Sequence, residues 1–161
     1  MKVFLGGSIS IKRFGAETSM LVEDLMAEQT EFLIGDADGA DRELQEYLEC
    51  SYYGLVTVYA CNGKARNNVG GWEVKAINVP AGLYGREYYE QKDIAMTAAC
   101  DVGLMVWDGK SKGTLNNIKR LVNAGKLCYV CIPKLRYKFS VRWDSGIQRL
   151  IEIVNKEILD D

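Results

Sequence analysis

The sequence predicts an α/β fold in which helices cover both faces of a mostly parallel sheet of about five strands. Short apolar runs alternate along the chain with longer segments whose apolar residues recur at helical spacing. The run at residues 127–132 is apolar throughout, which is typical of a parallel strand covered on both faces. The chain has 161 residues, 48% of them apolar, which is enough for one domain with a substantial core. This alternation favours a Rossmann-like three-layer α/β/α arrangement.

The expected elements follow one another in βαβα order. The five strands are expected at residues 3–5, 32–34, 55–60, 102–107 and 127–132. A short strand at 74–77 is the one regular element that the Gly- and Asn-rich segment 61–85 could contain. Helices are expected around 17–28, from residue 40, over 87–99, over about 112–124, and over a last stripe from Ile147 to Ile158. Gly125 is well placed to end the fourth helix, and a basic, aromatic connection follows Pro133.

Composition excludes several classes of function. The net charge is −2 and the aromatic residues are not interleaved with basic runs, so nucleic acid is not an expected partner. The chain has no histidine, which removes Ser-His and Cys-His nucleophile pairs and His-based zinc sites. No metal and no cofactor are expected. No apolar stretch approaches membrane-spanning length, and the N-terminus is interpreted as a first strand rather than a signal peptide.

The five cysteines favour reduced, buried thiols and a cytoplasmic location, because they are odd in number and mostly lie in apolar segments. Cys128 and Cys131 have C-x-x-C spacing. Positions three apart on a strand face opposite sides, so this pair is predicted not to hold a metal together.

Glycine-containing turns follow three of the apolar runs, after Leu5, Ile34 and Trp107. The carboxyl ends of parallel strands gather at one edge of the sheet, where open α/β sheets bind their ligands. Glycine lets backbone N–H groups approach an anion closely, and a helix N-terminus adds partial positive charge. These turns therefore predict a site for a nucleotide or a nucleotide-derived ligand.

The turn after residue 34 holds three carboxylates, those of Asp36, Asp38 and Asp41. In one interpretation Asp38 is the N-cap of the next helix and Asp41 interacts favourably with its dipole. In the other, one carboxylate binds ribose hydroxyls while backbone amides face a phosphate. Both interpretations stay open at this point.

The segment from Trp107 to Thr114 leaves a strand and opens a helix, so its amides, hydroxyls and lysines are expected to cradle a phosphate. It lacks the order of a Walker A loop. Lys64, Arg66 and Arg86 are either further phosphate contacts or solvated surface charges.

The turns G-G-S and G-D-A-D-G-A-D and the block W-D-G-K-S-K-G-T resemble those of the SLOG superfamily, and most of all its small YspA-like (DUF2493-type) proteins. The resemblance extends from residue 1 to about residue 132. It implies that residues 1–161 form a single nucleotide-binding domain and that the protein is a homo-oligomer. The superfamily includes phosphoribohydrolases and sensors of nucleotide signals, and nucleoside deoxyribosyltransferases have a similar architecture, so the ligand class is implied more firmly than any reaction.

One departure from the family pattern bears on chemistry. The motif P-G-G-x-G-T-x-x-E gives the phosphoribohydrolases a glutamate, and Asn117 stands at the matching position. An amide cannot act as a general base or as a carboxylate nucleophile, although it can still hydrogen-bond a base or ribose. The departure favours a sensor, carrier or sequestering module over an enzyme.

Two alternatives remain. One is an N-glycosidase, phosphoribohydrolase-like or deoxyribosyltransferase-like enzyme, in which Asp38 and Asp108 would be catalytic because both are expected to face the same crevice. The other is an interaction protein with a vestigial pocket. The residues expected to bind the ligand are Gly6, Gly7, Ser8, Gly35, Asp36, Asp38, Gly39, Asp41, Arg86, Asp93, Asp108, Gly109, Ser111, Gly113, Thr114 and Asn117.

Overall fold

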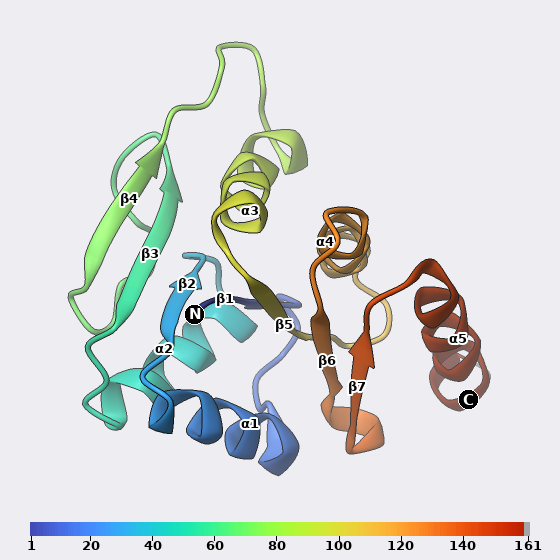
Figure 1. The fold of residues 1–161 in the computed structure, drawn as a ribbon. Coiled ribbons are helices and arrows are strands. Elements are labelled where there is room, and N and C mark those ends of the chain that lie inside the picture. The colour runs from blue at the N-terminus through green and yellow to red at the C-terminus, as the bar shows by residue number, and fades with distance from the viewer. Residues whose placement is uncertain (160–161) are drawn as a thin grey trace.

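A seven-stranded sheet forms the middle layer of the computed structural model, which describes residues 1–159 (Figure 1). The order of the strands across the sheet is β4-β3-β2-β1-β5-β6-β7, and every neighbouring pair is parallel except β6 and β7. The strands are β1 (Lys2–Gly7), β2 (Glu31–Ile34), β3 (Val56–Cys61), β4 (Glu73–Ile77), β5 (Val102–Val106), β6 (Cys128–Ile132) and β7 (Tyr137–Val141).

Helices cover both faces of this sheet, which confirms the predicted three-layer α/β/α class (Figure 1). Helices α1 (Gly15–Ala27) and α2 (Ala40–Cys50) pack on one face. Helices α3 (Arg86–Ala99), α4 (Lys112–Asn123) and α5 (Asp144–Val154) pack on the other. Short helical turns follow β6 at Pro133–Leu135 and α5 at Asn155–Leu159. None of the described helices has both the length and the apolar character that crossing a bilayer needs.

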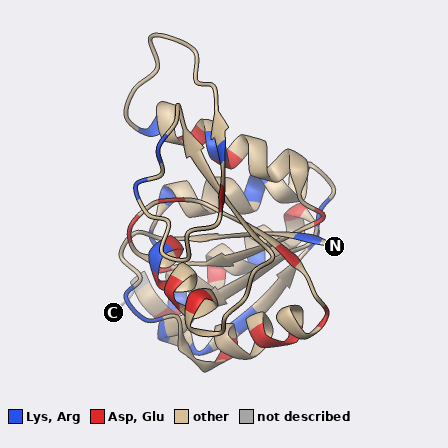
Figure 2. Ribbon diagram, turned by 90° about the vertical axis from the view of Figure 1, so that its left-hand side faces the viewer, with Lys and Arg blue, Asp and Glu red and all other residues tan. Residues whose placement is uncertain are grey.

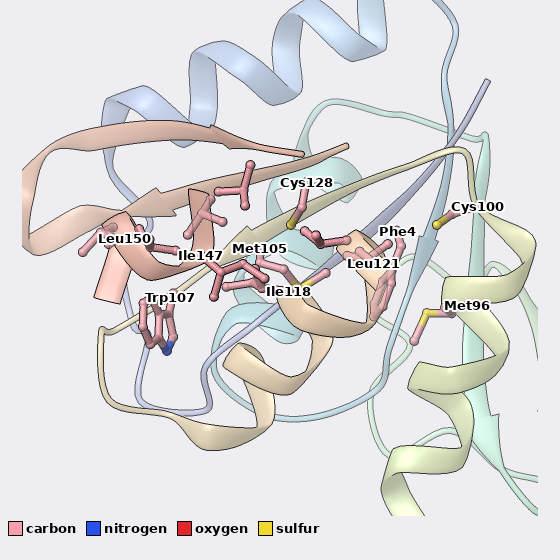
Figure 3. Packing of buried hydrophobic residues seen from close by; sticks show 14 of the residues in the cluster. Phe4, Met96, Cys100, Met105, Trp107, Ile118, Leu121, Cys128, Ile147 and Leu150 are labelled. Carbon is pink, nitrogen blue, oxygen red and sulfur yellow. The ribbon is translucent and has the colours of Figure 1, made fainter. Parts of the chain in front are cut away.

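Two apolar cores lie between these layers, because alternate residues of each buried strand point to opposite faces. In β1, Val3 and Leu5 belong to the core under α1 and α2, whereas Phe4 belongs to the core under α3 and α4. Figure 3 shows the second core, where Met96, Ile118 and Leu121 pack with Phe4 and Met105. Cys128 and Cys131 fall in different cores, as their spacing predicted.

Helix α4 shows why the local sequence sets element boundaries. The Ser111 hydroxyl accepts the Thr114 backbone N–H at 3.4 Å, so a side chain caps the first turn. At the other end Gly125 has a φ of 74°, and the Lys126 N–H returns to the Leu121 carbonyl at 3.0 Å. A left-handed residue and a returning N–H satisfy the last carbonyls of a helix. The predicted helix stop at Gly125 is confirmed.

The strand count differs from the prediction. The short strand at 74–77 is present as β4, but β7 was not predicted, because its segment was interpreted as a basic, aromatic connection. Strand β7 is an edge strand, in which Tyr137 and Lys138 are exposed and only Val141 is fully buried. An edge strand with so little cover carries no continuous apolar run, so hydrophobic patterning does not reveal it.

Charged residues lie on all five α-helices, whereas the inner strands β5 and β6 carry none. Figure 2 shows Lys and Arg interspersed with Asp and Glu along the helices and loops.

Candidate functional site

A cavity of about 260 Å³ opens at the carboxyl edge of the sheet, at the end of β1 and between α3 and α4. Its volume lies just below the range of about 300–1,000 Å³ typical of small-molecule sites. The chain places β2, β3 and β4 on one side of β1 and β5 on the other, so the cavity lies where the strand order reverses. The lining includes nine of the predicted residues: Gly6, Gly7, Asp41, Arg86, Asp93, Ser111, Gly113, Thr114 and Asn117.

The first turn of α4 forms one wall of this cavity. The Thr114 hydroxyl donates to the Ser111 hydroxyl at 3.2 Å and lies 3.1 Å from the Ser8 hydroxyl, which in turn accepts the Asp108 backbone N–H. Within residues 1–159 the Gly113 backbone N–H has no acceptor. Unpaired N–H groups and the positive end of the helix dipole favour an anion at this position.

Glycine is required at the end of β1. A Cβ atom on Gly7 would overlap the carbonyl oxygen of Val106 and would lie 2.7 Å from the Cβ of Ala40. This contact lets β1 approach β5 and α2 closely. The Ser8 N–H then reaches the Val106 carbonyl at 2.9 Å, which places the Ser8 hydroxyl against α4.

A group of charges lies on another part of the lining and consists of the buried Asp41 and Lys92 and the half-buried Asp93. The Lys92 side chain is only 7% exposed, and its ammonium donates to Asp93 Oδ1 at 2.7 Å. Asp41 Oδ2 accepts the Ala37 backbone N–H at 3.1 Å. A Cβ on Gly35 would lie 2.5 Å from Asp41 Oδ2 and 3.1 Å from Lys92 Nζ, so both groups pack against this glycine.

Burial and charge set the protonation of this group. Burial raises the pKa of Asp41 to about 7, and the nearby Lys92 ammonium only partly offsets it. Burial alone would lower the pKa of Lys92, but the carboxylates of Asp93 and Asp41 outweigh it and the pKa is raised. The cavity therefore contains a permanent cation beside a carboxyl that exchanges its proton near neutral pH.

Asn117 joins this group to a second ion pair. Its amide nitrogen donates to Asp93 Oδ2 at 3.2 Å, and its oxygen accepts from the Arg120 guanidinium at 2.6 Å. Arg120 also pairs with Glu90. The amide is both donor and acceptor here, a combination that an ionised glutamate could not supply.

The rim of the cavity is fixed by Arg66. Its guanidinium donates to Asp36 Oδ1 at 2.8 Å and lies 4.0 Å above the centre of the Tyr89 ring, while its backbone N–H donates to Asp36 Oδ2. Burial alone would raise the pKa of Asp36, but the hydrogen bonds and charge of Arg66 lower it. Asp36 is thus a buried partner of Arg66 and does not line the cavity.

Neither residue of the predicted catalytic pair, Asp38 and Asp108, lines the cavity. Asp108 accepts the Ser10 hydroxyl at 2.7 Å and the backbone N–H groups of Lys110 and Ser111. Burial alone would raise the pKa of Asp108, but these hydrogen bonds lower it. Asp38 accepts from the Asn67 amide at 3.0 Å. These hydrogen-bond partners hold both carboxylates outside the lining of the cavity.

Asp38 is also not the N-cap of α2, because Gly39 occupies that position with a φ of 76° and without a side-chain cap. A Cβ on Gly39 would overlap the Ile9 carbonyl, so close packing decides this helix start. Seven of the predicted ligand residues do not line the cavity: Asp36, Asp38, Gly39 and Asp108, whose positions are described above, and Ser8, Gly35 and Gly109. Gly109 packs against Val154 and Ile158.

Sequence reasoning missed Lys92, Glu90 and Arg120 as lining residues. The signal for Lys92 was present, since it lies four residues before Met96 on the buried stripe of α3. A lysine on an otherwise buried stripe is rare unless a partner or a ligand accompanies it.

Comparison of the chain with family models, with curated proteins and with solved structures found no match. Among residues 1–159, no group of three or more Cys, Asp or Glu side chains is placed to hold a metal ion. Fold and cavity together define a Rossmann-like α/β protein with a polar, mixed-charge cavity at the switch point of its sheet.

Proposed function

We propose that the cavity binds a nucleotide or a nucleotide-derived ligand, and that the protein acts as a sensor, carrier or sequestering module for it. One observation carries this proposal: the first turn of α4, with the unpaired Gly113 N–H, opens into the same cavity as the buried Lys92 ammonium. A helix N-terminus favours a phosphate, and polar groups buried nearby favour the rest of a polar ligand.

The resemblance to SLOG proteins supports the same proposal. Its glycine turn after β1 and its W-D-G-K-S-K-G-T block contribute Gly6, Gly7, Ser111, Gly113 and Thr114 to one cavity. The two segments are about a hundred residues apart in the chain, and the parallel pairing of β1 with β5 brings them to the same edge of the sheet. Membership of the superfamily is accordingly part of the proposal.

The direct test is a thermal-shift screen with AMP, ADP-ribose, cyclic ADP-ribose isomers, NAD and nucleosides. A ligand at about a hundredfold over its dissociation constant stabilises the folded state by about 2.7 kcal/mol, which such a screen detects. We expect at least one clear stabilisation. If no compound shifts the melting temperature, the nucleotide proposal fails and an interaction protein with a vestigial pocket becomes the better account.

A pair of variants at Gly113 locates the binding. A side chain fits here, because the only atom near an added Cβ is the Ser111 hydroxyl oxygen at 4.0 Å. Gly113→Asp adds a negative charge to the first turn, which favours the helix itself but repels an anionic ligand. We expect Gly113→Asp to lose ligand stabilisation while Gly113→Asn, its uncharged match, retains much more of it. Equal binding by the two variants would place the anion elsewhere.

A second function, cleavage of an N-glycosidic bond by a hydrolase or a deoxyribosyltransferase-like enzyme, is favoured by one observation. Three carboxyl residues line the cavity, Asp41, Glu90 and Asp93, and Asp41 has a pKa of about 7. A carboxyl with that pKa suits a general acid, and a second carboxylate suits stabilisation of an oxocarbenium-like transition state. Chromatography of the ligand after incubation distinguishes the two functions. An intact ligand indicates a binding protein. Release of the free base by the wild-type protein, but not by the Asp93→Asn variant, indicates an enzyme.

A homo-oligomer and a cytoplasmic location belong to the same proposal. All five cysteines are unpaired, and Cys100, Cys128 and Cys131 are buried, which suits a reducing compartment. Sedimentation velocity at micromolar concentration tests the oligomer: a species of 18.0 kDa alone would contradict it.

A further inference from the structure

We propose that Asp41, Lys92 and Asp93 recognise the cis-diol of a ribose, so that the cavity selects ribonucleotides over 2′-deoxyribonucleotides. This inference rests on the proposed function and adds the substrate class. The observations behind it are the hydrogen-bonding groups that this cluster leaves unused.

The Lys92 ammonium carries two such unused donors. An ammonium has three N–H donors, and within residues 1–159 only Asp93 Oδ1 accepts one of them, at 2.7 Å. The side chain is 93% removed from solvent and lines the cavity. Burying unsatisfied donors of a charged group costs several kcal/mol unless a partner is supplied. A ligand oxygen in the cavity would be that partner.

The two carboxylates leave acceptor capacity on either side of the lysine. An ionised carboxylate has about four acceptor sites. Asp41 accepts only the Ala37 N–H, and Asp93 accepts one bond from Lys92 and one from Asn117. Both residues line the cavity with Lys92. The cluster therefore presents an acceptor, a donor and a second acceptor to a bound molecule.

A cis-diol matches this arrangement better than the other parts of a nucleotide. Its two hydroxyls each donate one hydrogen bond, one to each carboxylate, and their oxygens accept from the ammonium. The richest donor edge of a base, the N1–H and amino group of guanine, points its two donors in one direction and suits a single carboxylate. A dianionic phosphate has no donor, and both carboxylates would repel it. Removing the 2′-hydroxyl leaves one of these charged groups without its partner.

The test compares matched sugars on the wild-type protein by isothermal titration calorimetry at pH 8, where Asp41 is ionised. The probes are ribose 5-phosphate with 2-deoxyribose 5-phosphate, and each ribonucleotide of the screen with its 2′-deoxy counterpart. We expect the deoxy compounds to bind roughly tenfold more weakly or worse, since each loses a hydrogen bond to a charged group. Equal affinities within a pair would overturn the inference while leaving the proposed function intact. Failure of every compound to bind would overturn both.

Variants assign the selectivity to the cluster. Lys92→Met keeps the length of the side chain and removes the ammonium, so the ratio of ribo to deoxy affinity should approach one. Asp41→Asn, which keeps the shape and the Ala37 contact, should lower the ratio as well. Lys12→Met and Asp24→Asn are exposed controls and should leave the ratio unchanged. A ratio unaffected by both cluster variants, with circular dichroism showing a native fold, would contradict the assignment. If Lys92→Met does not fold, the Asp41→Asn variant and the comparison of ribo and deoxy compounds still test the inference.

Discussion

The guanidinium of Arg66 lies 2.8 Å from the carboxylate of Asp36, although the two residues are 30 positions apart in the chain. Because Arg66 also lies over the Tyr89 ring, one side chain connects the loop after β3 to the end of β2 and to α3. This connection fixes one side of the cavity rim before any ligand is present.

Asp36→Asn should destabilise the fold by about 1–2 kcal/mol. The Asp36 side chain is 4% exposed and loses two charge-assisted hydrogen bonds, but the loss is moderated because Arg66 is 40% exposed and can be solvated. Urea denaturation of both proteins measures the difference. The exposed pair of Arg42 and Glu46 is the matched control, and Arg42→Gln should cost less than about 0.5 kcal/mol. Equal effects would mean that the Asp36 pair contributes no more than a surface pair.

Asp41 should make the protein less stable as the pH rises. Its pKa is about 7 when folded and 3.8 without the protein environment, so the folded state binds this proton more tightly. The stabilisation is fully present below about pH 3.8 and is lost as the pH rises toward 7. Asp41→Asn removes the titration. The free energy of unfolding of Asp41→Asn relative to wild type should therefore increase between pH 4.5 and 8, by on the order of 1–4 kcal/mol.

Urea melts at several pH values measure this difference, and Asp24→Asn on the exposed face of α1 is the control. A difference between Asp41→Asn and wild type that stays constant over this range would show that Asp41 ionises normally in the folded protein.

Gly7→Ala should destabilise the protein by about 1–3 kcal/mol or more, because the added methyl overlaps the Val106 carbonyl and separates β1 from β5. Gly54→Ala provides the control, since no atom lies within 4 Å of its added Cβ. That variant should change stability by no more than about 0.5 kcal/mol. Thermal denaturation compares the two, and a tolerated alanine at position 7 would refute the close approach of the strands.

Thiol labelling should separate the cysteines by burial. Cys50 is exposed, whereas burial raises the pKa of both Cys128 and Cys131 and suppresses the reactive thiolate. In the native protein a maleimide should modify Cys50 rapidly and leave these two unmodified, as peptide mass spectrometry can show. In 8 M urea all five should react. Rapid native labelling of either strand cysteine would place that strand at the surface.

Local patterning was sufficient for most of the fold. The apolar stripe of α4 and the apolar run of β6 each consist of the residues that face a core. Because these residues recur at short, regular spacing, the pattern can be recognised in the sequence alone. The helix stop at Gly125 could also be predicted from the sequence, because it depends on the backbone conformation of a single residue. Hydrophobic patterning could not reveal strand β7. Its side chains are largely exposed, and its place in the sheet depends on backbone pairing with β6.

The sequence could place glycines and carboxylates at the strand ends, because the alternation of strands and helices brings those ends to one edge of the sheet. It could not show which carboxylate points into the cavity. Asp38 and Asp108 are turned to Asn67 and Ser10, whereas Asp41 and Lys92 both pack against Gly35 and line the cavity. A side chain in a turn takes its direction from hydrogen-bond partners that are distant in the chain, and those partners exist only once the sheet has assembled.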